Sequence, residues 1–209
     1  MPKIEPFETH LEQYEEWFVQ NKFAYQSELS AVQMLLPKTG EGIEIGVGSG
    51  LFAEPLGIKN GVEPSAQMRA LAAKRGVSVK EGVAENLPYP DHSFGFALMV
   101  TTICFLDNVD KAFSEALRIL KPGGRFIIGF IDKESPLGKL YQKYQQENVF
   151  YRLATFYSVD EVVQHLNKAG FKNFRFTQTI FQPLDQIKQV EPVKEGYGEG
   201  SFVVVAGEK

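Results

Sequence analysis

The chain has 209 residues, 44% of them hydrophobic and 23% charged, which predicts one soluble globular domain spanning residues 1–209. Its formal net charge is −4 at pH 7, and the absence of a basic cluster argues against a nucleic-acid partner. Cys104 is the only cysteine, which excludes an internal disulfide and a cysteine-based zinc site. The acidic N-terminus lacks the apolar core of a signal peptide, and no apolar run reaches the roughly 18 residues that span a bilayer. We therefore expect a cytoplasmic protein without a membrane partner.

The first predicted elements are helical. Residues 7–36 carry apolar side chains at the spacing of two amphipathic helices, and residues 37–42 end this pattern. Short apolar segments then alternate with helical ones. We expect strands at 42–45, 61–62, 77–79, 94–100, 125–131, 174–180 and 201–206.

Capping residues mark the predicted helices between these strands. We expect a very short helix at 52–56, and a longer one that Ser65 caps and Gly76 ends. Asp107 or Asn108 begins the next helix, which the Lys-Pro-Gly-Gly run at 121–124 stops. The sequence SVDE at 158–161 matches a capping box and opens a helix that ends at Gly170.

Alternating strands and helices are typical of a doubly wound α/β domain with a mostly parallel sheet. The last two predicted strands have no helix between them, so we expect an antiparallel hairpin to close one edge. A ligand in such a fold binds beyond the carboxyl ends of the strands.

The segment EIGVGSG, residues 44–50, follows the first predicted strand and has glycine at every second position. Glycines there permit positive φ angles and let main-chain N–H groups approach a ligand closely. A phosphate-binding Walker loop requires a lysine after its last glycine, and none follows Gly50. The dinucleotide fingerprint requires a third glycine where this chain has Leu51. The spacing fits neither pattern.

Three further segments in order extend this observation across residues 41–131. After Glu44-Ile45-Gly46-Val47-Gly48-Ser49-Gly50, the second strand ends in Glu63, GVAENLPYPDHSF follows at 82–94, and EALRILKPGGRFII at 115–128. This series resembles class I S-adenosylmethionine-dependent methyltransferases, in particular the small-molecule, methyltransferase type 11-like branch. The resemblance implies a Rossmann-like sheet of seven strands in the order 3-2-1-4-5-7-6.

The resemblance also implies a set of cofactor-binding residues for S-adenosylmethionine. The acid at the end of the second strand, here Glu63, binds the ribose hydroxyls in this family. Val83 stands where many members have an aspartate near the adenine, so we expect adenine contacts from Ala84 and Glu85. The whole predicted set is Glu44, Gly46, Val47, Gly48, Gly50, Glu63, Pro64, Ser65, Val83, Ala84, Glu85, Val100 and Thr101, with no metal.

Two aromatic-rich regions, residues 1–36 and the insertion 132–157, correspond to the lid over the acceptor in small-molecule members of the family. The predicted acceptor contacts are Tyr14, Trp17, Tyr25, Thr102, Cys104 and Tyr144. For Cys104, a buried small apolar side chain is the alternative. No residue is identified as catalytic.

The sequence therefore predicts SN2 transfer of a methyl group to N, O or S of a small metabolite, with an amine as one candidate, and S-adenosylhomocysteine as product. No Asn/Asp-Pro-Pro-Tyr motif follows the fourth strand, which argues against methylation of nucleic-acid bases. Two alternatives are a non-catalytic S-adenosylmethionine-binding or regulatory protein and an NAD(P)-dependent oxidoreductase. The position of the third glycine and the terminal hairpin weigh against the oxidoreductase. The oligomeric state is left open.

Overall fold

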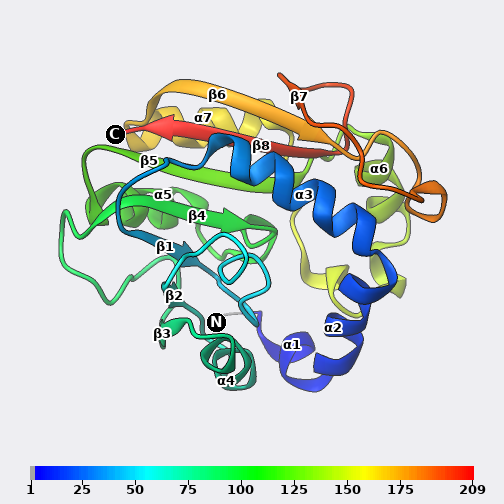
Figure 1. The fold of residues 1–209 in the computed structure, drawn as a ribbon, viewed down its shortest axis with the longest axis horizontal. Coiled ribbons are helices and arrows are strands. Elements are labelled where there is room, and N and C mark those ends of the chain that lie inside the picture. The colour runs from blue at the N-terminus through cyan, green and yellow to red at the C-terminus, as the bar shows by residue number, and fades with distance from the viewer. Residues whose placement is uncertain (1–2) are drawn as a thin grey trace.

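The computed structural model describes residues 3–209. At its centre is an eight-stranded sheet with the order β3-β2-β1-β4-β5-β8-β6-β7 (Figure 1). Neighbouring strands from β3 to β5 run parallel, whereas β8 is antiparallel to β5 and β6, and β7 is antiparallel to β6. The predicted parallel sheet and its antiparallel closing strands are confirmed.

The sheet consists of β1 (Gly42–Ile45), β2 (Asn60–Val62), β3 (Ser78–Lys80), β4 (Phe94–Val100), β5 (Leu120–Ile131), β6 (Lys172–Thr179), β7 (Lys194–Glu195) and β8 (Phe202–Glu208). The α-helices are α1 (Glu5–Thr9), α2 (Leu11–Gln20), α3 (Lys22–Leu35), α4 (Ala66–Lys74), α5 (Val109–Ile119), α6 (Pro136–Lys143) and α7 (Val159–Ala169).

Helices cover both faces of the sheet. Figure 1 shows α3 in front of the sheet, with α5 and α7 behind it. Phe113 of α5 and Leu166 of α7 are fully buried in the core on their face. Ala31 and Val32 of α3 are fully buried on the other face, where they share a core with Leu98 of β4. The strands between these layers are shielded from water on both sides, which explains their nearly continuous apolar runs.

Capping explains most of the helix boundaries. The side chain of Asn108 accepts a hydrogen bond from the main-chain N–H of Lys111 and begins α5, so of the two predicted caps Asn108 is the one used. The predicted capping box is confirmed, because Ser158 and Glu161 bond to each other's main-chain N–H groups at the start of α7. Gly170 ends this helix in the left-handed conformation.

Three predicted elements differ in the structure. Residues 7–36 lie in three helices and not two, because the chain leaves helical dihedral angles at His10 as well as at Asn21. The predicted helix at 52–56 is a series of turns, since Pro55 has no N–H for a continuous helical ladder. An eighth strand, β7, adds two residues to the outer edge of β6. With β7 set aside, the observed strand order matches the predicted one.

The parallel register brings three strand ends together. Ile45 pairs with Val62, and Glu44 pairs with Leu98, so β1, β2 and β4 end along the same edge of the sheet. Figure 1 shows α1 and α2 beyond this edge. Within residues 3–209, no helix combines the length and the apolar character that a membrane crossing requires.

Candidate functional site

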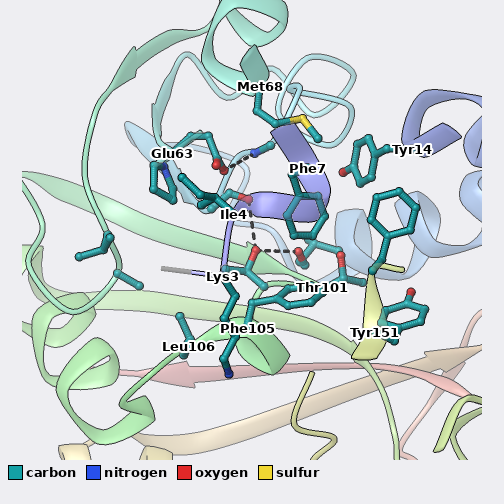
Figure 2. A pocket seen from close by; sticks show the side chains of 18 of the residues that line it. Lys3, Ile4, Phe7, Tyr14, Glu63, Met68, Thr101, Phe105, Leu106 and Tyr151 are labelled. Carbon is teal, nitrogen blue, oxygen red and sulfur yellow. Dashed lines mark hydrogen bonds between the residues drawn. The ribbon is translucent and has the colours of Figure 1, made fainter. Parts of the chain in front are cut away.

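A cavity of about 680 Å³ lies at the carboxyl ends of β1, β2 and β4. Its volume is within the range of roughly 300–1,000 Å³ that is typical of small-molecule and cofactor sites. Figure 2 shows Ile4 and Phe7 of the N-terminal segment with Glu63 and Met68 to one side and Thr101 and Phe105 to the other. The N-terminal segment therefore forms part of the cavity wall.

The glycine loop after β1 forms another part of this wall. Gly46 and Gly48 both have positive φ angles, +71° and +53°. A Cβ atom at Gly46 would lie 2.4 Å from Cγ2 of Thr102, and one at Gly48 would lie 3.2 Å from the hydroxyl of Tyr14. Gly46 is thus required both by the backbone conformation and by the side chain packed against it.

Glu63 extends its carboxylate toward this loop from the end of β2. Its Oε2 accepts a hydrogen bond from the N–H of Gly48 at 3.0 Å, and its Oε1 accepts one from the N–H of Ser65 at 2.9 Å. The side chain is 8% exposed, and burial raises its pKa, while these two N–H groups and Arg69 oppose the increase. A carboxylate has about four lone-pair positions, so each oxygen can still accept another hydrogen bond.

Glu44 is buried directly before the glycine loop. Burial is the main cause that raises its pKa well above the usual value, the main-chain N–H of Ala53 opposes the increase, and the charge of Glu63 adds to it. Its Oε2 atom has no hydrogen-bond partner within residues 3–209. A buried oxygen without a donor is uncommon and indicates that a donor is supplied from elsewhere.

The loop after β4 is held in a strained conformation. Thr101 has a φ angle of +49°, which is rare for a β-branched residue, and its N–H donates to the carbonyl of Gly129 at 2.8 Å. The hydroxyl of Thr102 lies 3.2 Å from the carbonyl oxygen of Gly46 and 3.1 Å from that of Val100. These contacts tie the end of β4 to the glycine loop.

A turn at residues 83–86 lines the cavity beyond β3. Val83 and Asn86 form an isolated antiparallel bridge that presents Ala84 and Glu85. Oε1 of Glu85 accepts hydrogen bonds from the N–H groups of Asp107 and Asn108, at 2.9 and 3.1 Å. Glu85 therefore both lines the cavity and holds the loop that leads into α5.

Aromatic rings surround the remaining part of the cavity. We call this group the aromatic chamber; it consists of Phe7, Tyr14, Trp17, Phe18, Phe105, Tyr141, Phe150 and Tyr151. Many of the rings touch, with centroids 5.1 Å apart for Phe7 and Phe105 and 4.9 Å apart for Tyr141 and Tyr151. Burial raises the pKa of Tyr14 and of Tyr151 well above the usual value, so both hydroxyls stay protonated at neutral pH.

Comparisons with known proteins agree with this geometry. A model of the methyltransferase domain matches residues 43–128. A solved Thermotoga maritima protein, named as an SAM-dependent methyltransferase and possible histamine N-methyltransferase, is 54% identical, with a TM-score of 0.97 and coverage of 99% of both chains. The chain belongs to the class I S-adenosylmethionine-dependent methyltransferases.

Two further proteins, one similar in sequence and one in fold, show how far the likeness extends. An uncharacterised protein of Methanocaldococcus jannaschii is 47% identical over 203 residues, which cover 97% of this methyltransferase and 98% of the relative. A phosphoethanolamine N-methyltransferase 2 of Haemonchus contortus, solved with S-adenosyl-L-methionine, is 19% identical with a TM-score of 0.64, over 88% of this chain and 52% of that one. The second likeness concerns the fold alone.

The residues at the strand ends suit S-adenosylmethionine, the cofactor of this enzyme. Gly46 and Gly48 place main-chain atoms in the cavity wall without a side chain of their own. The free lone pairs of Glu63 can accept hydrogen bonds from a diol, and the unpartnered Oε2 of Glu44 can accept one from an ammonium group or a bridging water. Among residues 3–209, no group of three or more His, Cys, Asp or Glu side chains could hold a metal ion.

The structure brings most of the predicted cofactor residues of this methyltransferase into one cavity. The predicted residues that line it are Gly46, Gly48, Glu63, Pro64, Val83, Ala84, Glu85, Val100 and Thr101. Glu44, Val47, Gly50 and Ser65 are not among the lining residues. Val47 contacts Gly61, and Ser65 caps α4 by accepting a hydrogen bond from the N–H of Met68 at 3.2 Å. Their contacts with a bound cofactor stay predictions.

The predicted acceptor residues are more dispersed. Tyr14, Trp17 and Thr102 line the cavity, whereas Tyr25 and Tyr144 do not. The hydroxyl of Tyr25 donates to the carbonyl of Leu51, and Tyr144 is 44% exposed at the end of α6.

Cys104 lies in a second, much smaller cavity of about 20 Å³, together with Tyr141 and Tyr151. Its Sγ donates to the carbonyl of Thr101 at 3.2 Å, and burial raises its pKa to about 12. Cys104 is partly buried, and its contact with an acceptor stays a prediction beside the alternative of a small apolar side chain.

Sequence reasoning missed several residues that line the cavity. Ile4 and Phe7 lie in the N-terminal segment predicted as part of the lid, but neither was predicted to contact a ligand. Glu28 on α3 also lines the cavity, and this residue had a signal in the sequence. It lies at helical spacing between Tyr25 and Val32, on the face predicted to be buried, where a carboxylate is unexpected.

Proposed function

We propose that this methyltransferase transfers the methyl group of S-adenosylmethionine to N, O or S of a small molecule, with an amine as the leading acceptor. One observation carries the proposal: a single cavity joins the glycine loop and Glu63 to the aromatic chamber. A site of this size holds a cofactor and a metabolite. The net charge of −4 also argues against a nucleic-acid acceptor.

We assign the strand ends to the cofactor. In this proposal Glu63 accepts hydrogen bonds from the ribose hydroxyls, and the turn at 83–86 borders the adenine. The loop at 46–50 and Glu44 take the amino-acid end. Because Gly48 and Ser65 already fix the carboxylate of Glu63, its orientation costs little entropy when the cofactor binds.

We assign residues 1–36 and 132–157 to a lid on a single domain, although residues 1–2 lie outside the described part. Support comes from Trp17 of α2 and Tyr151, which line the same cavity as the strand ends. S-adenosylmethionine supplies a methyl group that is already activated on a sulfonium. The main task of the chamber is therefore to exclude water and to hold the acceptor in line.

The test measures S-adenosylhomocysteine release with a panel of small amines, alcohols and thiols, together with calorimetric binding of S-adenosylmethionine and NADH. We expect S-adenosylmethionine to bind, NADH not to bind, and at least one amine to support turnover. Tight cofactor binding without any release of S-adenosylhomocysteine across the panel would contradict the assignment to small acceptors. It would favour a binding or regulatory role instead.

A further inference from the structure

Glu28 places a buried carboxylate in the wall of the cavity. The side chain is 5% exposed, and within residues 3–209 no group gives it a hydrogen bond or an ion pair. Burial raises the pKa of Glu28 to about 8. A carboxyl group in this position has lost most of its contact with water without gaining a protein partner, which is costly when the group is charged. A titratable group of this kind in a cavity indicates a functional role.

The helix around Glu28 is firmly attached to the rest of the domain. The hydroxyl of Ser27 accepts a hydrogen bond from the N–H of Glu191 at 2.8 Å and donates to the carbonyl of Phe23 at 2.6 Å. The carbonyl of Ala31 accepts a hydrogen bond from the hydroxyl of Thr177 on β6 at 2.9 Å. The carboxylate is therefore presented from a fixed helix, as ligand recognition requires.

The other two glutamates that line the cavity have hydrogen-bond partners, unlike Glu28. Glu63 and Glu85 both accept hydrogen bonds from main-chain N–H groups. Glu28 instead faces the aromatic chamber. Burial raises the pKa of Tyr141 and of Tyr151, and the charge of Glu28 adds to both increases. A ligand in the chamber can therefore supply the partner that Glu28 lacks.

We propose that Glu28 binds the ammonium group of an amine acceptor, an inference that rests on the proposed function. An ammonium donates hydrogen bonds and carries the opposite charge, so it satisfies the buried carboxylate. The surrounding rings attract the same cation through their faces. Glu28 is a binding residue in this proposal, and no proton transfer is assigned to it.

This arrangement predicts selectivity by charge. A hydroxyl in place of the ammonium supplies one hydrogen-bond donor and no charge. A neutral analogue therefore offsets only a small part of the free energy that burial of the Glu28 carboxylate costs. An acceptor with a carboxylate or phosphate at this position is repelled. For a given skeleton, binding should decrease from the amine to the alcohol to the acid.

The experiment measures binding to the protein saturated with S-adenosylhomocysteine, which makes turnover unnecessary. The probes are n-butylamine, 2-phenylethylamine and tryptamine, each compared with its alcohol and its carboxylic acid analogue. We expect at least one amine to bind about 10–100-fold more tightly than its alcohol, the factor expected for hydrogen bonds to a charged group. Glu28→Gln should remove this preference and change alcohol binding by less than about threefold. Glu28→Asp should retain part of the preference.

Glu16→Gln is the matched control, because Glu16 is exposed on α2 and does not line the cavity. It should keep the preference for amines. S-adenosylhomocysteine binding, measured first in every variant, reports folding and tests the proposed function separately. Failure of the wild type to bind S-adenosylhomocysteine would overturn the proposed function. Normal binding of this product, combined with amines that bind no better than alcohols or bind equally well to Glu28→Gln, would overturn the role of Glu28 alone.

Discussion

Glu63 and Glu28 line the same cavity, yet the protein treats the two carboxylates differently. Both are more than nine-tenths buried, at 8% and 5% exposure, and burial raises both pKa values. Glu63 receives two main-chain hydrogen bonds from its own strand end and the glycine loop, whereas Glu28 receives none from residues 3–209. The strand ends are thus organised before a ligand arrives, and the helical side leaves a carboxyl group without a partner. This difference suits the proposed site, in which the strand ends always bind the same cofactor and the helical side selects the acceptor.

The largest expected effect tests the organised side. Gly46→Ala introduces a Cβ 2.4 Å from Thr102 Cγ2 at a residue with a φ angle of +71°. We expect a loss of roughly 2–5 kcal/mol in the free energy of unfolding, from backbone strain and overpacking together, and weakened cofactor binding. Urea denaturation and calorimetry with S-adenosylmethionine measure the two effects.

Gly57→Ala is the control for this variant. Gly57 has almost the same φ angle, +72°, but a Cβ atom there meets nothing within 4 Å. It should lose only about 1–2 kcal/mol, the cost of the left-handed conformation, and bind the cofactor normally. Equal losses in the two variants would show that the contact with Thr102 has no consequence.

The second prediction concerns the pH dependence of stability. The folded-state pKa of Glu28, about 8, lies above its ordinary value of 4.5, so the folded protein binds this proton more tightly than the unfolded chain. Glu28 therefore lowers stability progressively as pH rises between these two values. Glu28→Gln should match the wild type near pH 4 and be more stable by on the order of 4–5 kcal/mol at pH 8.5.

Urea denaturation at pH 4.5, 6.5 and 8.5 checks this prediction. The charge of Glu28 acts on two tyrosines, Tyr141 and Tyr151. Both have raised pKa values and do not titrate in this range. A stability difference that is constant with pH would mean that Glu28 is paired or hydrated in solution. The contrast with Glu63 would then be lost.

The third prediction concerns the cofactor. Glu63→Ala should weaken S-adenosylmethionine binding by about 1–3 kcal/mol, the scale of hydrogen bonds lost to a charged group. Glu81→Ala is the control, because Glu81 forms an exposed ion pair with Arg69 nearby and does not line the cavity. Calorimetry with both variants makes the comparison. Unchanged affinity in Glu63→Ala would refute its role at the ribose.

The smallest expected effect lies in the aromatic chamber. Trp17→Ala should raise the KM for an active amine about 2–10-fold, since a cation–π contact contributes roughly 0.5–1 kcal/mol at exposed sites and more when desolvated. Cofactor affinity should change by less than about twofold. Tyr197→Ala, which removes an aromatic side chain outside the cavity, should leave both constants as they are. A larger effect on the cofactor than on the amine would place Trp17 beside the cofactor.

The sequence predicts which residues line the cavity at the strand ends better than it predicts those contributed by the helices. Gly46, Gly48 and Glu63 act through local geometry, because each follows directly from a strand, and parallel strands end at one edge. The partners of Tyr25 and Tyr144 depend on how separate helices pack, which periodicity does not specify. The edge strand β7 is missed because its two residues are too few to show alternation. The helical spacing places Glu28 on a buried face, but only the folded chain shows that it lacks a partner and lines the cavity.

The double constraint at Gly46 has an evolutionary consequence. Gly57 and Gly76 adopt positive φ angles in open space, so asparagine or aspartate can replace them as sequences diverge. Gly46 has no such freedom, because the side chain of Thr102 occupies the space that any replacement would need. Among distant relatives, a residue other than glycine at position 46 should therefore occur together with a change at position 102. These two positions, 56 residues apart in the chain, should diverge as a pair.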